Sequence, residues 1–266
     1  MRYFIVDAFI IALSMLWGIV GCSPRQVSSV RQSGETDPNA WLARADSLFN
    51  STLKKYADVL EAYQVVRQSQ KELSNDHARK YEALTRAALY AVWLALHDNE
   101  RRDILTHAND AIALSTQAVL LNNVRVEGFY YRAIATGLFA EQNKAYGRSA
   151  MNEIRSDGER AIELDPKFDH AGPHRLLGAF YLRAPGPPAG FGSVRKATAH
   201  LEKACTISPA YPENLIFLAE AYLKSNRHEE AGLLLDRAHS LVGTEGNLLD
   251  QQKWQEQLNQ LKMKIE

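Results

Sequence analysis

The chain has 266 residues, and 46% of them are hydrophobic, which is enough for a sizeable buried core and argues against global disorder. Lysine plus arginine and aspartate plus glutamate each total 31, so the formal net charge is zero and no general excess of basic charge is present to hold nucleic acid. The two cysteines, Cys22 and Cys205, are too few for a disulfide framework.

Residues 1–21 are predicted to be a lipoprotein signal peptide. A basic residue at position 2 precedes an apolar stretch over residues 3–17, which is the layout of a secretory signal. The ending Ile19-Val20-Gly21-Cys22 resembles the lipobox of bacterial lipoproteins, in which the chain is cut before the cysteine and the cysteine is acylated. We therefore expect a membrane anchor at Cys22. The alternative is an ordinary signal peptide that happens to contain a cysteine.

The residue after the cysteine is Ser23 rather than aspartate. By resemblance to the enterobacterial sorting rule, this residue predicts a protein of the outer membrane that faces the periplasm. Residues 22–38 are rich in Ser, Gln and Arg and lack apolar periodicity, so we expect a flexible tether. The folded domain is predicted to span residues 39–266.

The first part of this domain is predicted to be helical, because residues 39–127 contain neither glycine nor proline. Polar clusters at residues 74–76, 97–99 and 122–123 mark the ends of helices. Asp76 and Asn99 are the predicted N-caps, since their side chains can accept hydrogen bonds from free backbone N–H groups. Strand-type alternation is not convincing anywhere in the chain.

An internal repeat at the C-terminal end identifies the architecture. Ala197, Leu201 and Ala204 recur 34 residues later as Ala231, Leu235 and Ala238, and this is the period of the tetratricopeptide repeat (TPR). We therefore predict an all-α fold, a TPR-like α-solenoid of about five helical hairpins and a C-terminal capping helix. The hairpins are expected at 39–72, 76–121, 125–165, 170–208 and 212–242, and the capping helix at 247–264.

Motifs that carry chemistry are missing from the sequence. Neither a Gly-Lys-Ser/Thr phosphate loop nor a Gly-x-Ser-x-Gly nucleophile elbow occurs. His170 and His174 have the spacing of metal ligands, but Ala171 stands where zinc proteases have glutamate, so capping or packing is favoured over a metal site. Cys205 lies beside Ala204 in a predicted helix and is expected to be an inert thiol. We therefore predict a protein without enzymatic activity, cofactor or metal.

The first candidate for binding is a run of aromatic residues. Phe129, Tyr130 and Tyr131 are consecutive, and three consecutive side chains cannot all face the same side of one helix. We expect one of them to face a groove or cavity, and Tyr130 and Tyr131 are candidates for contact with a partner. The alternative is that these side chains simply fill the core between repeats.

The second candidate is an insertion in the fourth hairpin. Seven extra residues lie between its two helices, within 183–192, and three prolines and three glycines occur in residues 185–192. Such a loop is partly stiff and partly permissive, which suits a contact surface. Pro187, Pro188 and Phe191 are the candidate contact residues, with Phe191 as a hydrophobic anchor. The alternative is an ordinary longer connection.

The C-terminal part of the sequence also resembles a known family. Glu163-Leu164-Asp165-Pro166, Asp169-His170-Ala171-Gly172-Pro173, the insertion at 183–192 and the regular last repeat together resemble the T component of TPR-associated TRAP transporters. The resemblance implies a periplasmic lipoprotein with an internal channel or cavity that associates with a solute-binding protein. A channel would also suit a hydrophobic small ligand. The competing hypothesis is a generic outer-membrane TPR adaptor that grips a peptide in its concave face.

Overall fold

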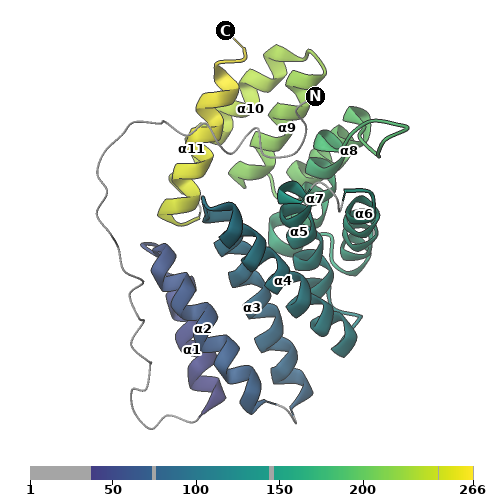
Figure 1. Cartoon of the computed structure of the whole chain (residues 1–266). Helices are drawn as coiled ribbons and strands as arrows, with labels where there is room; N and C mark the ends of the chain where they lie inside the picture. Colours follow the sequence, from purple (N-terminus) through teal and green to yellow (C-terminus); the bar gives the residue numbers. More distant parts are fainter. Residues whose placement is uncertain (1–36, 74–75, 144–146, 245, 266) are drawn as a thin grey trace, which may run out of the picture.

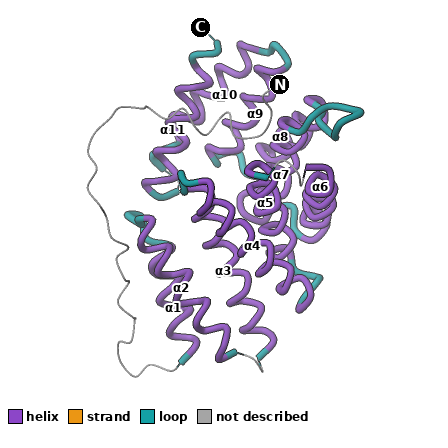
Figure 2. Tube along the Cα trace, viewed as in Figure 1, coloured by secondary structure: helices purple, strands orange, loops and turns teal. Residues whose placement is uncertain are grey.

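The computed structural model describes residues 37–73, 76–143, 147–244 and 246–265, which form eleven α-helices and no strand (Figure 2). Ten helices pair into hairpins (Figure 1): α1 (Pro38–Phe49) with α2 (Tyr56–Glu72), α3 (His77–His97) with α4 (Arg101–Leu121), α5 (Val126–Gln142) with α6 (Gly147–Leu164), α7 (Phe168–Arg183) with α8 (Val194–Ile207), and α9 (Pro212–Lys224) with α10 (His228–Leu241). A single helix, α11 (Leu248–Lys262), follows them. These bounds lie within a few residues of the predicted hairpins and confirm the predicted fold class.

Local hydrogen bonds explain where several helices begin. The carboxylate of Asp76 accepts the N–H of Arg79 at 3.0 Å, which confirms Asp76 as the N-cap of α3. The prediction for Asn99 is wrong, because α4 begins after Glu100. Before the helix, the carboxylate of Asp98 accepts the N–H groups of both Asn99 and Glu100, at 3.0 and 3.4 Å.

Small residues occupy the places where helices approach most closely. A Cβ atom on Gly178 of α7 would lie only 2.5 Å from the Cγ atom of Leu201 on α8. A Cβ atom on Gly158 of α6 would lie 2.6 Å from Leu177 in the same way. The repeated residues are all fully buried: Ala197, Leu201, Ala204, Ala231, Leu235 and Ala238. The 34-residue repeat therefore reflects the residues that pack inside the last two hairpins.

The closing helix joins the two ends of the solenoid. Trp254, Leu258 and Leu261 of α11 are buried against α9 and α10. At its other end the N–H of Leu248 donates to the carbonyl of Thr52, in the turn between α1 and α2, at 3.2 Å. Figure 1 shows α11 beside the last hairpin, with its lower end toward the first. The predicted capping helix thus also connects to the N-terminal hairpin.

Within the described ranges, no helix combines the length and the apolar character needed to cross a bilayer.

Candidate functional site

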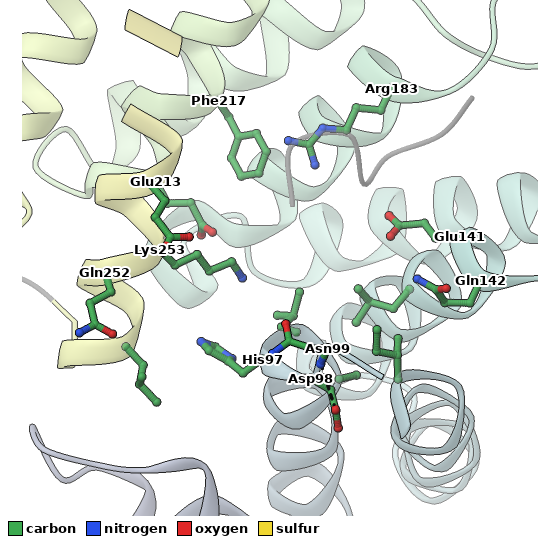
Figure 3. A pocket seen from close by; sticks show the side chains of 16 residues that line it. His97, Asp98, Asn99, Glu141, Gln142, Arg183, Glu213, Phe217, Gln252 and Lys253 are labelled. Atoms are coloured by element: carbon green, nitrogen blue, oxygen red, sulfur yellow. Dashed lines mark hydrogen bonds between the residues drawn. The ribbon is translucent and has the colours of Figure 1, made fainter. Parts of the chain in front are cut away.

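A cavity of about 510 Å³ lies on the concave side of the stacked hairpins. Its wall is built by the end of α1, by the first helices of the following hairpins (α3, α5, α7 and α9) and by α11. A second cavity of about 320 Å³, drawn in Figure 3, adjoins it and shares part of its lining, including His97, Glu213, Phe217 and Lys253. Both volumes fall within the range of about 300–1,000 Å³ typical of small-molecule sites.

Aromatic side chains form much of the wall of the larger cavity. Tyr130 and Tyr131, both candidates from the sequence, line it and are only 3% and 9% exposed. The ring of Phe168 lies 5.4 Å from that of Tyr130 and 6.0 Å from that of Tyr131, in edge-on contacts. Four further aromatic side chains line the cavity near its charged groups: Phe49, Trp93, Tyr211 and Trp254. The two tyrosines are therefore available to a molecule inside the cavity.

A buried arginine links three of the cavity helices. Arg175 of α7 is 6% exposed, and its Nε atom lies 2.9 Å from the carboxylate of Glu213 on α9. Its Nη2 atom donates to the carboxylate of Asp169 at 2.8 Å, and Nη1 donates to the side-chain oxygen of Asn214 at 3.0 Å. The hydroxyl of Tyr130 on α5 also donates to the carboxylate of Asp169. Each of the three guanidinium nitrogens therefore has a fixed hydrogen-bond or ion-pair partner.

The same arginine holds an unusual stretch of backbone. Asp169, His170 and Ala171 all have left-handed φ angles, of 48°, 54° and 65°. Non-glycine residues adopt this conformation only where their surroundings impose it. Nη1 of Arg175 donates to the carbonyls of Asp169 and His170, at 3.3 Å each. The regular helix resumes after this turn, so Pro173 lies in its first turn, where its missing N–H group costs no hydrogen bond.

A polar contact joins α3 and α11 at the wall of the cavity. The Nδ1 atom of His97 lies 2.8 Å from the carbonyl of Trp93 and donates to it, since a carbonyl can only accept. The Nε2 atom of the same ring lies 3.4 Å from the carboxylate of Asp250. Burial opposes ionisation of Asp250, yet the contact with His97 and the charge of Lys54 lower the pKa of this carboxyl.

The smaller cavity contains a partly buried carboxyl group, that of Glu141 (Figure 3). Burial raises the pKa of Glu141 to about 8, although the positive charges of Arg183 and Lys253 act in the opposite direction. Arg183 is itself paired with Glu220, at 3.0 Å. Glu141 is therefore mostly protonated at neutral pH and can donate a hydrogen bond into the cavity.

Glu141 leads to a prediction about pH. Its pKa is raised in the folded state, from an ordinary value of 4.5 to about 8, so the folded protein binds a proton that the unfolded chain releases. This contribution to stability is complete below about pH 4.5 and is lost as the pH rises towards 8. We expect Glu141→Gln to unfold at a higher urea concentration than the wild type at pH 8.5, with a much smaller difference at pH 5. Equal differences at both pH values would contradict the assignment.

The insertion lies where the sequence places it, between α7 and α8. Pro187 and Pro188 are exposed at its tip, whereas Phe191 is half-buried against the core. The ring of Phe191 lies 6.4 Å from that of Phe180, and the guanidinium of Arg155 lies 4.4 Å from its centre. Phe191 therefore also anchors the loop to the protein itself, because its ring packs on the fourth hairpin. The loop does not meet Tyr130 and Tyr131, which lie in the cavity.

The two cysteines lie in different parts of the chain, and only Cys205 belongs to a described helix. Cys22 lies outside the described residues, so its acylation stays a prediction. Cys205 is half-buried on α8, and burial raises the pKa of its thiol to about 12. A thiol with so high a pKa is not a nucleophile at neutral pH.

The histidines have packing partners. His170 stacks on Tyr211, with ring centres 4.3 Å apart. His174 faces His200 of α8, and their Nδ1 atoms lie 3.2 Å apart. Burial and the charges of neighbouring groups lower the pKa of His174 to about 4. In the part of the chain that the structure describes, no cluster of three or more potential metal ligands occurs.

Sequence reasoning did not single out the charged residues of the cavity. The clearest signal in the sequence is that of Arg175, which shares one helix face with Gly178 and Leu182, at spacings of three and seven residues. A charged residue that shares a helix face with small and apolar residues indicates a buried polar cluster. Lys54 and Lys253 gave no such signal, since both lie in polar sequence.

Comparison with known proteins gives both a family and a fold. The family model of TAtT, the TRAP transporter T-component, matches residues 42–239. A solved thermophilic TPR protein from Thermus thermophilus is similar with a TM-score of 0.62 and 20% identity, over 84% of this chain and 100% of its own. A MamA structure is similar with a TM-score of 0.46 and 20% identity, over 69% and 88% of the two chains. None of the curated proteins compared matches. The Thermus likeness supports the TPR fold.

Proposed function

The chain belongs to the TRAP transporter T-component family, and from this premise we propose that it is a lipid-anchored TPR scaffold facing the periplasm that binds the solute-binding protein of a TRAP-type transporter. The family match carries this proposal, because it spans residues 42–239 and so includes all or most of every hairpin. TPR-type solenoids act through binding surfaces rather than catalytic groups, and the helices here form such a solenoid.

The shape of the concave face bears on the competing hypothesis. A generic TPR adaptor grips an extended or helical peptide in an open groove. In this chain α11 connects the last hairpin to the first, and the cavity between them has a volume of about 510 Å³, a size suited to a small molecule. The proposal therefore places the protein partner on the outside of the solenoid and an apolar small molecule in the cavity.

The loop between α7 and α8 is the proposed contact surface for the solute-binding protein. Its tip presents Pro187 and Pro188 to solvent, while Phe191 is fixed to the body of the protein by Phe180 and Arg155. A stiff loop held at its base loses little conformational freedom when a partner binds. This arrangement supports a contact surface whose exposed tip and anchored base have different roles.

Substitutions in the loop test this assignment. We expect Pro187→Asp to weaken binding to the solute-binding protein about tenfold or more without changing the melting temperature, because the tip is exposed. Phe191→Ala should weaken binding and also lower the free energy of unfolding by about 1–2 kcal/mol, since its ring is half-buried. Binding is measured by biolayer interferometry and stability by thermal unfolding.

The matched control is Leu120→Asp, which puts the same charge on another exposed apolar residue, at the end of α4. Unchanged affinity in Pro187→Asp, and in a protein whose loop is shortened by seven residues, would remove the loop from the interface. Failure of the wild-type protein to form any complex with the solute-binding protein would overturn the proposed function itself.

Anchoring at Cys22 is tested by mass spectrometry of the mature protein. The expected amino terminus is an acylated cysteine, because Ile19-Val20-Gly21-Cys22 resembles a lipobox. Cys22→Ala should block processing and acylation, while Cys205→Ala serves as the control and should leave both unchanged. A Cys22→Ala protein that is still processed and still bound to the membrane would contradict the anchor.

A further inference from the structure

One charged side chain in the larger cavity is buried without an ordinary partner. Lys54, in the turn between α1 and α2, is 7% exposed and lines the cavity. Its Nζ atom lies 3.7 Å from the centre of the Phe49 ring and 5.2 Å from that of Trp93. No hydrogen bond or ion pair to this Nζ atom occurs among the residues that the structure describes. Buried ammonium groups are normally paired, so this arrangement calls for an explanation.

The carboxylate whose charge acts on Lys54 is that of Asp250, and it is engaged elsewhere. One of its oxygens lies 3.4 Å from Nε2 of His97, and the other accepts a hydrogen bond from the side chain of Asn247. Burial lowers the pKa of Lys54, and the charge of Asp250 offsets this effect only in part. The aromatic rings stabilise the ammonium from one side and leave its N–H donors unused.

A second unused donor lies in the same part of the wall. The Nε1 atom of Trp93 is buried and has no hydrogen-bond partner in the described part of the chain. An indole N–H can only donate, and a buried donor without an acceptor costs free energy. Because this N–H group is closed off from the cavity, of the two groups only the ammonium of Lys54 presents donors at this end of the aromatic wall. Arg175, by contrast, already has its carboxylate partners, Asp169 and Glu213.

We propose that this end of the cavity binds the carboxylate of an apolar organic acid, which pairs with Nζ of Lys54 beside the rings of Phe49 and Trp93. The apolar part of the acid then lies against the aromatic wall formed by Tyr130, Tyr131 and Phe168. An ionised carboxylate only accepts hydrogen bonds and carries the complementary charge, so it suits the N–H donors of the Lys54 ammonium. This inference rests on the proposed function only in assuming that the cavity takes a small molecule.

Three ligands with the same ten-carbon chain separate the possible head groups: decanoate, decanol and decyltrimethylammonium. Their binding to the purified chain without residues 1–22, which keeps every described helix, is measured by isothermal titration calorimetry. We expect decanoate to bind about tenfold or more tightly than decanol, because a hydrogen bond to a charged group is worth more than one to a neutral group. Decyltrimethylammonium should bind most weakly, since it would face the ammonium of Lys54.

Substitutions then assign the head group to its residues. Lys54→Met should weaken decanoate about ten- to hundredfold and leave decanol unchanged, because the methionine keeps the apolar stem but not the charge. The control is Lys55→Met, which removes the same charge from the neighbouring, exposed lysine and should change neither ligand.

The outcomes separate failure of the carboxylate site at Lys54 from failure of the proposed function. Equal binding of decanoate and decanol, a preference for decyltrimethylammonium, or full decanoate affinity in Lys54→Met would each overturn the carboxylate site while leaving a cavity for small molecules. Absence of binding by all three ligands would overturn the site and the cavity function together, but not binding of the solute-binding protein. Because the comparison of ligands uses the wild-type protein, the inference can fail even if Lys54→Met does not fold. Where that variant folds, we expect its ligand-free form to melt no lower than the wild type, since a buried, unpaired charge has been removed.

Discussion

Replacing Arg175 with methionine is expected to lower the free energy of unfolding by about 3–5 kcal/mol, because removing one partner of a buried ionic network leaves the others uncompensated. The carboxylates of Asp169 and Glu213 would lose the guanidinium that lies 2.8 and 2.9 Å from them. The left-handed turn before α7 would also lose the donors that hold its carbonyls. A single residue thus connects the packing of α5, α7 and α9.

The measurement is urea unfolding followed by circular dichroism, with Arg102→Met as the control because Arg102 is exposed on α4. Arg175→Lys should restore little of the stability, since one ammonium cannot meet Asp169, Glu213 and Asn214 in the geometry of the guanidinium fork. A loss below about 1 kcal/mol in Arg175→Met, a value typical of exposed ion pairs, would contradict the central place of this residue.

Removal of residues 243–266 is expected to destabilise the protein more than Arg175→Met does. The truncated protein loses the buried side chains of Trp254, Leu258 and Leu261, each worth about 1.5–3 kcal/mol, and exposes the apolar faces of α9 and α10. It also loses the wall of the cavity that contains Asp250 and Lys253. We expect aggregation or a loss of helicity, together with loss of decanoate binding.

Size-exclusion chromatography with light scattering and thermal unfolding measure this outcome. The control is removal of residues 263–266 alone, which keeps the three buried side chains and takes away the exposed Met263 and the partly buried Ile265. A protein without residues 243–266 that stays monomeric and melts at the wild-type temperature would show that α11 does not complete the solenoid.

The hairpins could be predicted from sequence because their signals are local. The Ala and Leu residues of the 34-residue repeat, polar clusters such as residues 122–123 and the N-cap Asp76 all lie in or next to the helices they define. The prediction at Asn99 missed the N-cap by one residue, since the N-cap of α4 is Glu100. Boundaries of this kind depend on side chains within a few residues, and the sequence contains that information.

The cavity could be predicted only in part, because it depends on how the solenoid curves. The run containing Tyr130 and Tyr131 indicated a groove or cavity, and both residues line one. The sequence does not reveal that α11 reaches Thr52, so Lys54 reads as an exposed charge in a turn and α11 only as a cap. The Lys54 ammonium becomes buried through contacts with Phe49 and Trp93, which follow from tertiary packing and leave no periodic pattern.

A crystal structure of the domain with 10-bromodecanoate tests most directly whether the concave face holds a small molecule rather than a peptide. Anomalous scattering from the bromine marks the end of the apolar chain, and the density of the carboxylate marks the other end. The expected result is bromine within the aromatic wall beside Tyr130 and Phe168, with the carboxylate at Lys54. Bromine density only on the outer surface, with the cavity unchanged, would contradict the assignment of this cavity as the ligand site.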